Sequence, residues 1–346
     1  MKTLAYWKKA LKASLIIQVS LLFLWACGNR EAVEVFTGPT MGTSYNIKAE
    51  FAKPVDHAAV QKAITDRLEV IEQSMSTYRP TSEISRFSQL PVGQSMTVSD
   101  DFLRVFDVSR QVYLLSGGAF NPSVAALVNL WGFGPKLTVE QFQHAPSDEA
   151  IQAARASMHF DKIQVNGNTL LKQDVVSLDF SAVAKGYAVD EIGKVLEGFS
   201  AHSYMVEIGG EVITRGESPR HTPWRIGIEL PQMLRGSVMS ALVLADAAVA
   251  TSGDYRNYIE IDGKRYSHTI DPRTAFPIAH KLTSVTVLAK TVAEADAWAT
   301  AMMVLGEDEG FALAQKLEMP AYYIYRSDNG FAVKHTAQMQ QYLAEH

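Results

Sequence analysis

The chain has 346 residues, and 47% of them are hydrophobic, which is enough to build a sizeable core and argues against a disordered protein. The formal net charge is −5 and no basic run occurs, so the composition argues against nucleic-acid binding. The single cysteine, Cys27, excludes a disulfide framework, an iron–sulfur cluster and a cysteine-based zinc site within one chain.

The N-terminus has the pattern of a secretory signal. Four lysines within 1–12 precede an apolar stretch over 13–26, which is too short for a comfortable membrane span. A small residue precedes Cys27, and this resembles the bacterial lipobox, in which the cysteine is lipidated and becomes the mature N-terminus. An uncleaved signal anchor with a chance cysteine is the alternative. Either way we expect the body, 36–346, to lie outside the cytoplasm, joined to a membrane by a tether over 27–35. Cleavage removes four lysines and no acid, so the net charge falls from −5 to −9.

The body begins with two predicted helices and continues mainly with strands. Apolar residues recur at steps of three and four over 57–76 after Asp56, and Ser99 precedes a second helix over 100–115. Asn166-Gly167 marks a hairpin between two short β-rich runs. Further β-rich runs occupy 203–208, 224–230, 238–244, 258–261, 284–289 and 321–325. Hairpin-linked strands with interspersed helices predict an α+β fold with mostly antiparallel sheets, in one catalytic body of one or two lobes.

The first candidate site lies on a helix that begins with a capping box formed by Thr291 and Glu294 and stops near Gly306. Asp296 and Thr300 are one turn apart, with Cβ atoms about 5–6 Å apart, among apolar neighbours. A buried carboxylate needs a partner, and a hard cation such as Mg²⁺ takes oxygen ligands of this kind. The alternative is an arginine paired with Asp296 and a Thr300 hydroxyl bonded to its own helix.

The second candidate is the segment 179–190, where Asp179 or Ser181 can cap a helix that begins near Ala182. Lys185 falls in the first turn, where a cation opposes the helix dipole unless an anion such as phosphate is bound. An exposed lysine on an ordinary helix is the alternative.

The third candidate is the polar loop 266–277. His268 in this loop is a possible general base. The alternative is a structural turn in which Asp271 caps backbone amides.

Taken together, these segments resemble the ApbE family of FAD:protein FMN transferases. The motifs stand in family order: MGTSY at 41–45, STY at 76–78, SEIS at 82–85, GAFNP at 118–122, NLWGFG at 129–134, LDFSAVAKGY at 178–187, EIGG at 207–210, ATSGDY at 250–255, SHTIDPRT at 267–274, and the pair Asp296 and Thr300. They cover about residues 36–306, which is most of the chain.

The resemblance implies an enzyme that binds FAD as substrate and Mg²⁺ as cofactor, moves FMN onto a Thr or Ser hydroxyl of an acceptor protein and releases AMP. It implies a FAD site of Met41, Tyr78, Ala119, Phe120, Asn121, Asp179 and Lys185, approached by the Ile270 backbone. It implies metal ligands from Asp296, Thr300 and the carbonyls of Ala182 and Ala299, and a His268 that activates the acceptor hydroxyl.

Family acceptors are subunits of membrane redox complexes, such as sodium-pumping NADH:quinone reductase and Rnf-type complexes. The resemblance therefore implies a lipid-anchored enzyme on the periplasmic face of the cell membrane, with the inner membrane favoured. FAD hydrolysis to FMN and AMP, and a flavin-binding lipoprotein without turnover, are the competing functions.

Two positions depart from the family pattern. Asn121 stands where relatives often carry Asp, which changes the contacts available to the flavin or adenine. Ala275 stands where relatives usually have Gly, so a left-handed turn at this position would be strained.

Overall fold

The computed structural model describes residues 33–135, 144–230, 238–254, 258–261 and 264–344. The predicted signal peptide, the lipidation site at Cys27 and most of the tether lie outside these residues. The first described strand begins at Glu34, inside the segment predicted as tether. None of the helices within the described ranges has the length and apolar character needed to cross a membrane.

The described residues form helices and strands in the following chain order. The elements are β1 (Glu34–Thr40), β2 (Thr43–Phe51), α2 (His57–Met75), α3 (Glu83–Gln89), β3 (Ser95–Thr97), α4 (Asp100–Leu115), α5 (Ala125–Leu130), α6 (Asp148–Arg155), η2 (Phe160–Lys162), β4 (Ile163–Asn166), β5 (Thr169–Lys172), α7 (Ala184–Gly198), β6 (Ala201–Ile208), β7 (Glu211–Arg215), β8 (Trp224–Glu229), β9 (Val238–Leu244), β10 (Ala247–Gly253), β11 (Tyr258–Ile261), β12 (Lys264–Ser267), β13 (Ile270–Asp271), β14 (Phe276–Pro277), β15 (Leu282–Ala289), α8 (Val292–Lys316), β16 (Ala321–Ser327), β17 (Gly330–His335) and η3 (Ala337–Tyr342).

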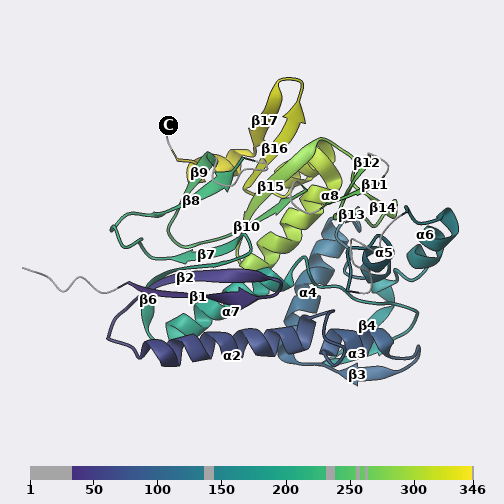
Figure 1. Cartoon of the computed structure of the whole chain (residues 1–346), viewed down its shortest axis with the longest axis horizontal. Helices are drawn as coiled ribbons and strands as arrows, with labels where there is room; N and C mark the ends of the chain where they lie inside the picture. The colour runs from purple at the N-terminus through teal and green to yellow at the C-terminus, as the bar shows by residue number, and fades with distance from the viewer. Residues whose placement is uncertain (1–32, 136–143, 231–237, 255–257, 262–263, 345–346) are drawn as a thin grey trace, which may run out of the picture.

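One eight-stranded antiparallel sheet organises the molecule. Its strand order is β1-β2-β6-β7-β10-β15-β16-β17, which rises along the sequence from one edge to the other. Figure 1 shows this order as a change of colour from purple β1 to yellow β17. The expected α+β fold with mostly antiparallel strands is confirmed.

Helices cover one face of this sheet. α7 packs on β6, α8 packs on β10 and β15, and α2 lies outside α7 (Figure 1). α2 forms because Asp56 caps Ala58 and Ala59 and because its apolar side chains share one face, which is buried against the body. The predicted helices at 57–76 and 100–115 therefore correspond to α2 and α4.

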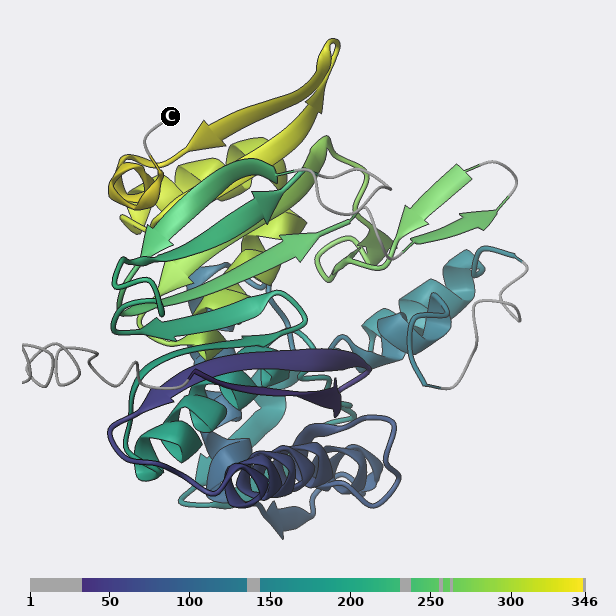
Figure 2. The same cartoon turned by 60° about the vertical axis from the view of Figure 1, so that its left-hand side comes forward.

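The opposite face of the sheet is covered by the β8–β9 hairpin and η3. Their apolar side chains form a second core with residues of β7, β10, β15 and β16, and Leu242 and Met339 are fully buried in it. At one end of the molecule, the small β11–β12 and β13–β14 sheets lie beside α5 and α6, as Figure 2 shows. The functional cavity described below borders both the hairpin and this end.

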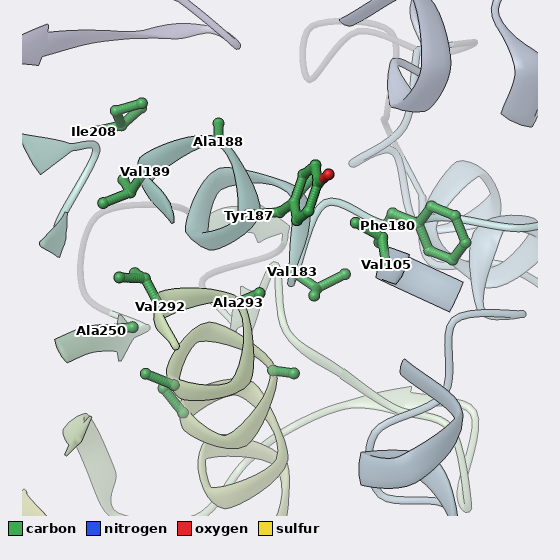
Figure 3. Packing of buried hydrophobic residues seen from close by; sticks show 14 of the residues in the cluster. Val105, Phe180, Val183, Tyr187, Ala188, Val189, Ile208, Ala250, Val292 and Ala293 are labelled. Carbon is green, nitrogen blue, oxygen red and sulfur yellow. The ribbon is translucent and has the colours of Figure 1, made fainter. Parts of the chain in front are cut away.

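α7 and α8 approach closely at Gly186. A Cβ atom built on Gly186 would lie 2.4 Å from the carbonyl oxygen of Val292, which no side chain allows. Val292 and Ala293 at the start of α8 are buried against α7, and Figure 3 shows them facing Val183 and Val189 across this contact. The glycine thus sets the spacing between the two helices that carry the candidate phosphate and metal residues.

α8 departs from its predicted end. The residues after Gly306 continue as helix to Lys316, but Gly306 itself has φ +80° and breaks the regular path. The His280 ring nitrogen Nε2 lies 2.8 Å from the carbonyl oxygen of Met303, in a hydrogen bond next to the kink. The predicted stop is therefore a kink, and the first segment of α8 is the part that carries the site.

Candidate functional site

A cavity of about 1280 Å³ collects almost all of the site residues predicted from the sequence. The predicted residues that line it are Met41, Tyr78, Ala119, Phe120, Asn121, Asp179, Ala182, Lys185, His268, Ile270, Asp296 and Thr300. Ala299 is fully buried and is not among the lining residues, and Cys27 lies outside the described ranges. The roles assigned to these residues remain predictions, but their proximity is a structural fact.

Asp296 lies in the first segment of α8 and faces α7. Its side chain is buried, and Oδ2 accepts a hydrogen bond of 3.0 Å from the backbone N–H of Gly186. Burial raises the pKa of Asp296, and the nearby Lys185 ammonium opposes that rise. The cation next to Asp296 is thus the lysine of α7, in place of the arginine considered as an alternative.

Lys185 lies in the first turn of α7, as predicted. Its Nζ donates to Glu211 Oε1 at 2.5 Å, and its side chain is 28% exposed where it borders the cavity. Burial by itself would lower the pKa of Lys185, but the charges of Glu211 and Asp296 outweigh it and raise the pKa to about 12. Lys185 is therefore a cation held in the cavity wall by carboxylates, and the exposed-lysine alternative is wrong.

Sequence reasoning did not single out Glu211, which the structure places at the centre of this charge cluster. The Glu211 side chain is 2% exposed, and burial raises its pKa against the pull of Lys185. Within the described ranges, its Oε2 has no hydrogen-bond partner. Glu207 also lines the cavity, and its Oε1 accepts from the N–H of Gly210. The sequence signal that could have found Glu211 is the segment 206–212, in which one glutamate stands on each side of a glycine pair and the other residues are apolar.

The oxygen atoms near Asp296 fit a small hard cation. Thr300 and Ala182 border the same cavity, and Thr300 Oγ1 lies 3.4 Å from Ser252 Oγ in a hydrogen bond. Among the residues that the structure describes, no group of three or more His, Cys, Asp or Glu side chains could hold a metal. An ion here would therefore combine one carboxylate with hydroxyl, carbonyl and substrate oxygens, which suits Mg²⁺ better than zinc.

The predicted cap of α7 is wrong. The structure begins the helix at Ala184, and the capping position, Val183, makes no side-chain cap. Asp179 Oδ1 instead accepts from the N–H and the hydroxyl of Ser181 in a local turn. Asp179 also donates its own N–H to the carbonyl oxygen of Pro122 at 2.7 Å, which fastens the turn to the neighbouring loop. The Asp179 carboxylate therefore holds a turn in the cavity wall and does not cap α7.

Asn121 forms a second turn in the same wall. Its Oδ1 accepts from the N–H of Ser123 at 2.9 Å and from the Ser123 hydroxyl at 2.6 Å. An aspartate would make the same two bonds, because both use a side-chain oxygen. The departure from the family pattern at this position therefore keeps the local turn and removes one negative charge from the cavity wall.

The loop that carries His268 contains the predicted structural turn and places the histidine at the cavity; its role as a general base stays a prediction. His268 borders the cavity, and its ring lies 6.3 Å from that of Phe133 in an edge-on arrangement. Asp271 Oδ1 accepts from the N–H of Arg273 at 2.9 Å, which is the predicted structural turn. Ala275 has φ +69° and is fully buried, so the strain expected of a non-glycine residue here is present.

Comparison with known proteins agrees with the motifs. A sequence model described as the ApbE family matches residues 41–323, and the FAD:protein FMN transferase of Vibrio cholerae is 41% identical over 335 residues, covering 96% of this chain and 99% of that protein. The chain belongs to the ApbE family. Membership rests on almost the whole length of both proteins, so the family resemblance expected from the motifs is confirmed.

Other ApbE relatives and solved structures support the same assignment. The FAD:protein FMN transferase of Haemophilus influenzae is 38% identical, covering 94% of this chain and 96% of that protein. The structure of the flavin transferase ApbE from Vibrio cholerae has a TM-score of 0.83 at 40% identity and covers 90% of this chain and 99% of that one. The apo form of the Pseudomonas stutzeri flavinyl transferase ApbE also has a TM-score of 0.83, at 37% identity, and covers 91% and 98%.

Proposed function

We propose that this protein transfers FMN from FAD to a hydroxyl group of an acceptor protein and releases AMP. The observation that carries this proposal is the meeting of Lys185 from α7 and Asp296 from α8 in one cavity with the predicted flavin-site residues. At about 1280 Å³ the cavity exceeds the usual range for small-ligand pockets, about 300–1,000 Å³, and so has room for a dinucleotide.

The residues at the α7–α8 contact suit a pyrophosphate. The Lys185 ammonium, which donates to Glu211, has further N–H groups that would donate to phosphate oxygens. Mg²⁺, held by Asp296, Thr300 and the Ala182 carbonyl, with Ala299 as a further predicted ligand, would neutralise phosphate charge there. The carboxyl groups of Glu211 and Asp296 lie beside the single ammonium of Lys185, and burial raises the pKa of both, so a second cation there would stabilise their charged forms.

In the proposed transfer, each bond that forms is matched by a bond that breaks, and the proton released is taken up by a side chain of the cavity. The acceptor hydroxyl oxygen attacks the phosphorus of the FMN half, the bond from this phosphorus to the bridging oxygen breaks, and AMP leaves with that oxygen. An imidazole nitrogen of His268 takes the hydroxyl proton as the new bond forms. Lys185 stabilises the charge that develops on the phosphate oxygens.

We also propose the setting in which this reaction takes place. The signal pattern before Cys27 supports a lipid anchor and a body on the periplasmic face of the membrane, with the inner membrane favoured. Acceptors would then be subunits of membrane redox complexes, such as sodium-pumping NADH:quinone reductase or Rnf-type complexes. Labelling with a radioactive fatty acid, lost in a Cys27→Ala variant, tests the anchor, and membrane fractionation tests the location.

The family resemblance implies that the acceptor carries a short motif ending in Ser-Gly-Ala-Thr or a close variant. The decisive experiment mixes the full-length protein with FAD, Mg²⁺ and an acceptor domain that carries this motif. We expect a fluorescent acceptor band on a denaturing gel, one AMP per flavin attached, and loss of both with EDTA. AMP without the band would instead support FAD hydrolysis. Bound FAD with neither product would support a binding protein.

Asp296→Asn provides the matched variant for this experiment. The amide oxygen still accepts from the Gly186 N–H, so the α7–α8 contact stays, but the negative ligand is lost. We expect the transfer rate to fall by about 100-fold or more, while FAD binding without Mg²⁺ changes little. Wild-type transfer by this variant would contradict the metal assignment.

A further inference from the structure

Glu72 lies between two walls of the cavity that are far apart in the sequence. One wall is the turn between β1 and β2, where Met41 and Gly42 border the cavity. The other is the loop after α2, which carries Tyr78. Glu72 itself is in the last turn of α2, borders the same cavity and has a side chain that is 21% exposed.

The first contact of Glu72 is to the strained turn. Met41 and Gly42 have φ +48° and +74°, so both central residues of this two-residue hairpin turn are left-handed. Such turns favour Asn, Asp or Gly at the first position, and methionine has no local side-chain bond with which to hold the conformation. Glu72 Oε1 accepts from the N–H of Met41 at 3.0 Å, so a carboxylate from another element holds it instead.

The second contact of Glu72 is to the loop. Glu72 Oε2 accepts from Arg79 Nη2 at 2.7 Å, and Arg79 directly follows Tyr78. Arg79 is also held by Glu69, through bonds of 2.5 and 2.9 Å to its two carboxylate oxygens. Tyr78 is 68% exposed at the cavity, so its ring is open for stacking while the residue after it is fixed by an ion pair.

We infer that Glu72 is a positioning residue for FAD: it sets the distance between the Met41 turn and the Tyr78 loop, so that one ring system of FAD fits between them. The inference rests on the proposed function. Glu72 bonds to Met41 and Arg79, whereas Lys185 and Asp296 lie at the α7–α8 contact, so we expect Glu72 to act on ring binding and not in the transfer step. The Glu72 carboxylate accepts from the Met41 N–H, and its ion pair with Arg79 fixes the Tyr78 loop. Both contacts order the site before FAD binds, which lowers the conformational entropy lost on binding.

Glu69 provides a matched control. Both glutamates are on α2 and both bind Arg79, but the bond to the Met41 N–H comes from Glu72. Glu72→Ala removes both contacts of Glu72. Glu72→Gln keeps an oxygen for the Met41 N–H and loses the charge. Glu69→Gln keeps the Met41 contact and loses a charge of the same sign on the same helix.

The experiment measures the Kd for FAD of the full-length protein by flavin fluorescence in EDTA, and then kcat with saturating FAD, Mg²⁺ and acceptor. We expect Glu72→Ala to raise the Kd about tenfold or more, Glu72→Gln about threefold, and Glu69→Gln less than twofold. We expect kcat to stay within about twofold of wild type in all three, as expected for a loss confined to ground-state binding.

Several results would overturn the inference. An unchanged Kd for Glu72→Ala would do so, as would an equal rise for Glu69→Gln, since helix charge and not the Met41 contact would then be responsible. A fall in kcat as large as the loss of affinity would assign Glu72 to the chemistry. If Glu72→Ala does not fold, Glu72→Gln and Arg79→Met, with an expected threefold to fivefold rise in Kd, decide the question. A wild-type protein that does not bind FAD would overturn the proposed function itself.

Discussion

Lys185 compensates two buried carboxylates, Glu211 and Asp296, so its removal affects both stability and turnover. We expect Lys185→Met to lower the free energy of unfolding by about 3 kcal/mol, because Glu211 is left buried and unpaired. Denaturant unfolding without FAD measures this. Turnover should fall by about 100-fold or more, because the phosphate loses its cation.

The double variant Lys185→Met with Glu211→Gln separates these two effects. Without the charge on Glu211 the burial cost is relieved, so we expect more than half of the lost unfolding free energy to return while turnover stays low. Recovery of turnover together with stability would contradict a direct role for Lys185 at the phosphate.

Single residues could be predicted from the sequence where a local rule places them. The capping box fixed the start of α8, and Thr291 does accept from the Glu294 N–H, so Asp296 and Thr300 were found from helical spacing alone. Glu211 escaped because its partner, Lys185, is 26 residues away and on another element. No local sequence pattern predicts this ion pair, because it forms only when the fold brings β7 next to α7.

At the scale of elements, the spacing of α7 and α8 depends on Gly186. We expect Gly186→Ala to lower the free energy of unfolding by about 2 kcal/mol or more, because its Cβ would collide with the Val292 carbonyl, which belongs to the backbone. The shift also disturbs the Gly186 N–H bond to Asp296, so turnover should fall as well. Thermal unfolding and the transfer assay measure the two effects.

Gly198→Ala is the matched control in the same helix. Gly198 is the last residue of α7, and a Cβ there meets no atom within 4 Å. We expect this variant to keep full activity and to gain up to about 1 kcal/mol from the higher helix propensity of alanine. Equal destabilisation of both variants would show that the close approach at Gly186 has no special importance.

Elements with their own signals were predicted well. α2 and α4 carry an N-cap and an apolar stripe, and the Asn166-Gly167 turn joins β4 to β5 as expected. β1 and β2, which form one edge of the sheet, were not predicted. In β2 the signal was present, because apolar and polar residues alternate from Tyr45 to Phe51, whereas Gly38 and Pro39 interrupt β1. The strained turn at Met41 that joins the two strands has no local turn signal at its first position. That turn depends on Glu72, a distant residue, which a local pattern cannot report.

At the scale of the whole molecule, one partly buried network joins three helices. Arg67 of α2 bonds both carboxylate oxygens of Asp101 in α4, each at 2.6 Å, and Glu191 of α7 at 2.6 Å. The hydrogen bond from Arg67 holds the pKa of Asp101 below its usual value. A carboxyl group with a depressed pKa stabilises the fold above its unfolded pKa, about 3.9, and this contribution is lost as the pH falls through the folded value.

We therefore expect Arg67→Met to lower the free energy of unfolding by about 3 kcal/mol at pH 7, and the difference from wild type to shrink below about pH 4. Urea unfolding at several pH values measures this. Arg110→Met is the control, since Arg110 pairs with Asp107 on the exposed side of α4, and it should change stability by less than about 0.5 kcal/mol. A pH-independent loss in Arg67→Met would indicate lost packing alone.

The fold class could be predicted from the sequence, but the arrangement of strands could not. Hairpin signals indicate antiparallel neighbours, and the pairs β6–β7 and β16–β17 follow that rule. The pairing of β2 with β6 joins Tyr45 to Ile208, which are 163 residues apart in the sequence (208 − 45), and α7 packs on β6 beneath this pairing. Such long-range pairing is decided by the shared core.

The rising strand order of the large sheet has a consequence for synthesis. Each new strand can join the free edge left by the strands made before it, from β1 to β17. The cavity, however, draws on the chain from Met41 to Thr300 and beyond, so no shorter nascent chain contains a complete site. Flavin therefore has no complete site on this chain until synthesis has passed α8, and a chain exported before it folds would first meet its nucleotide on the far side of the membrane.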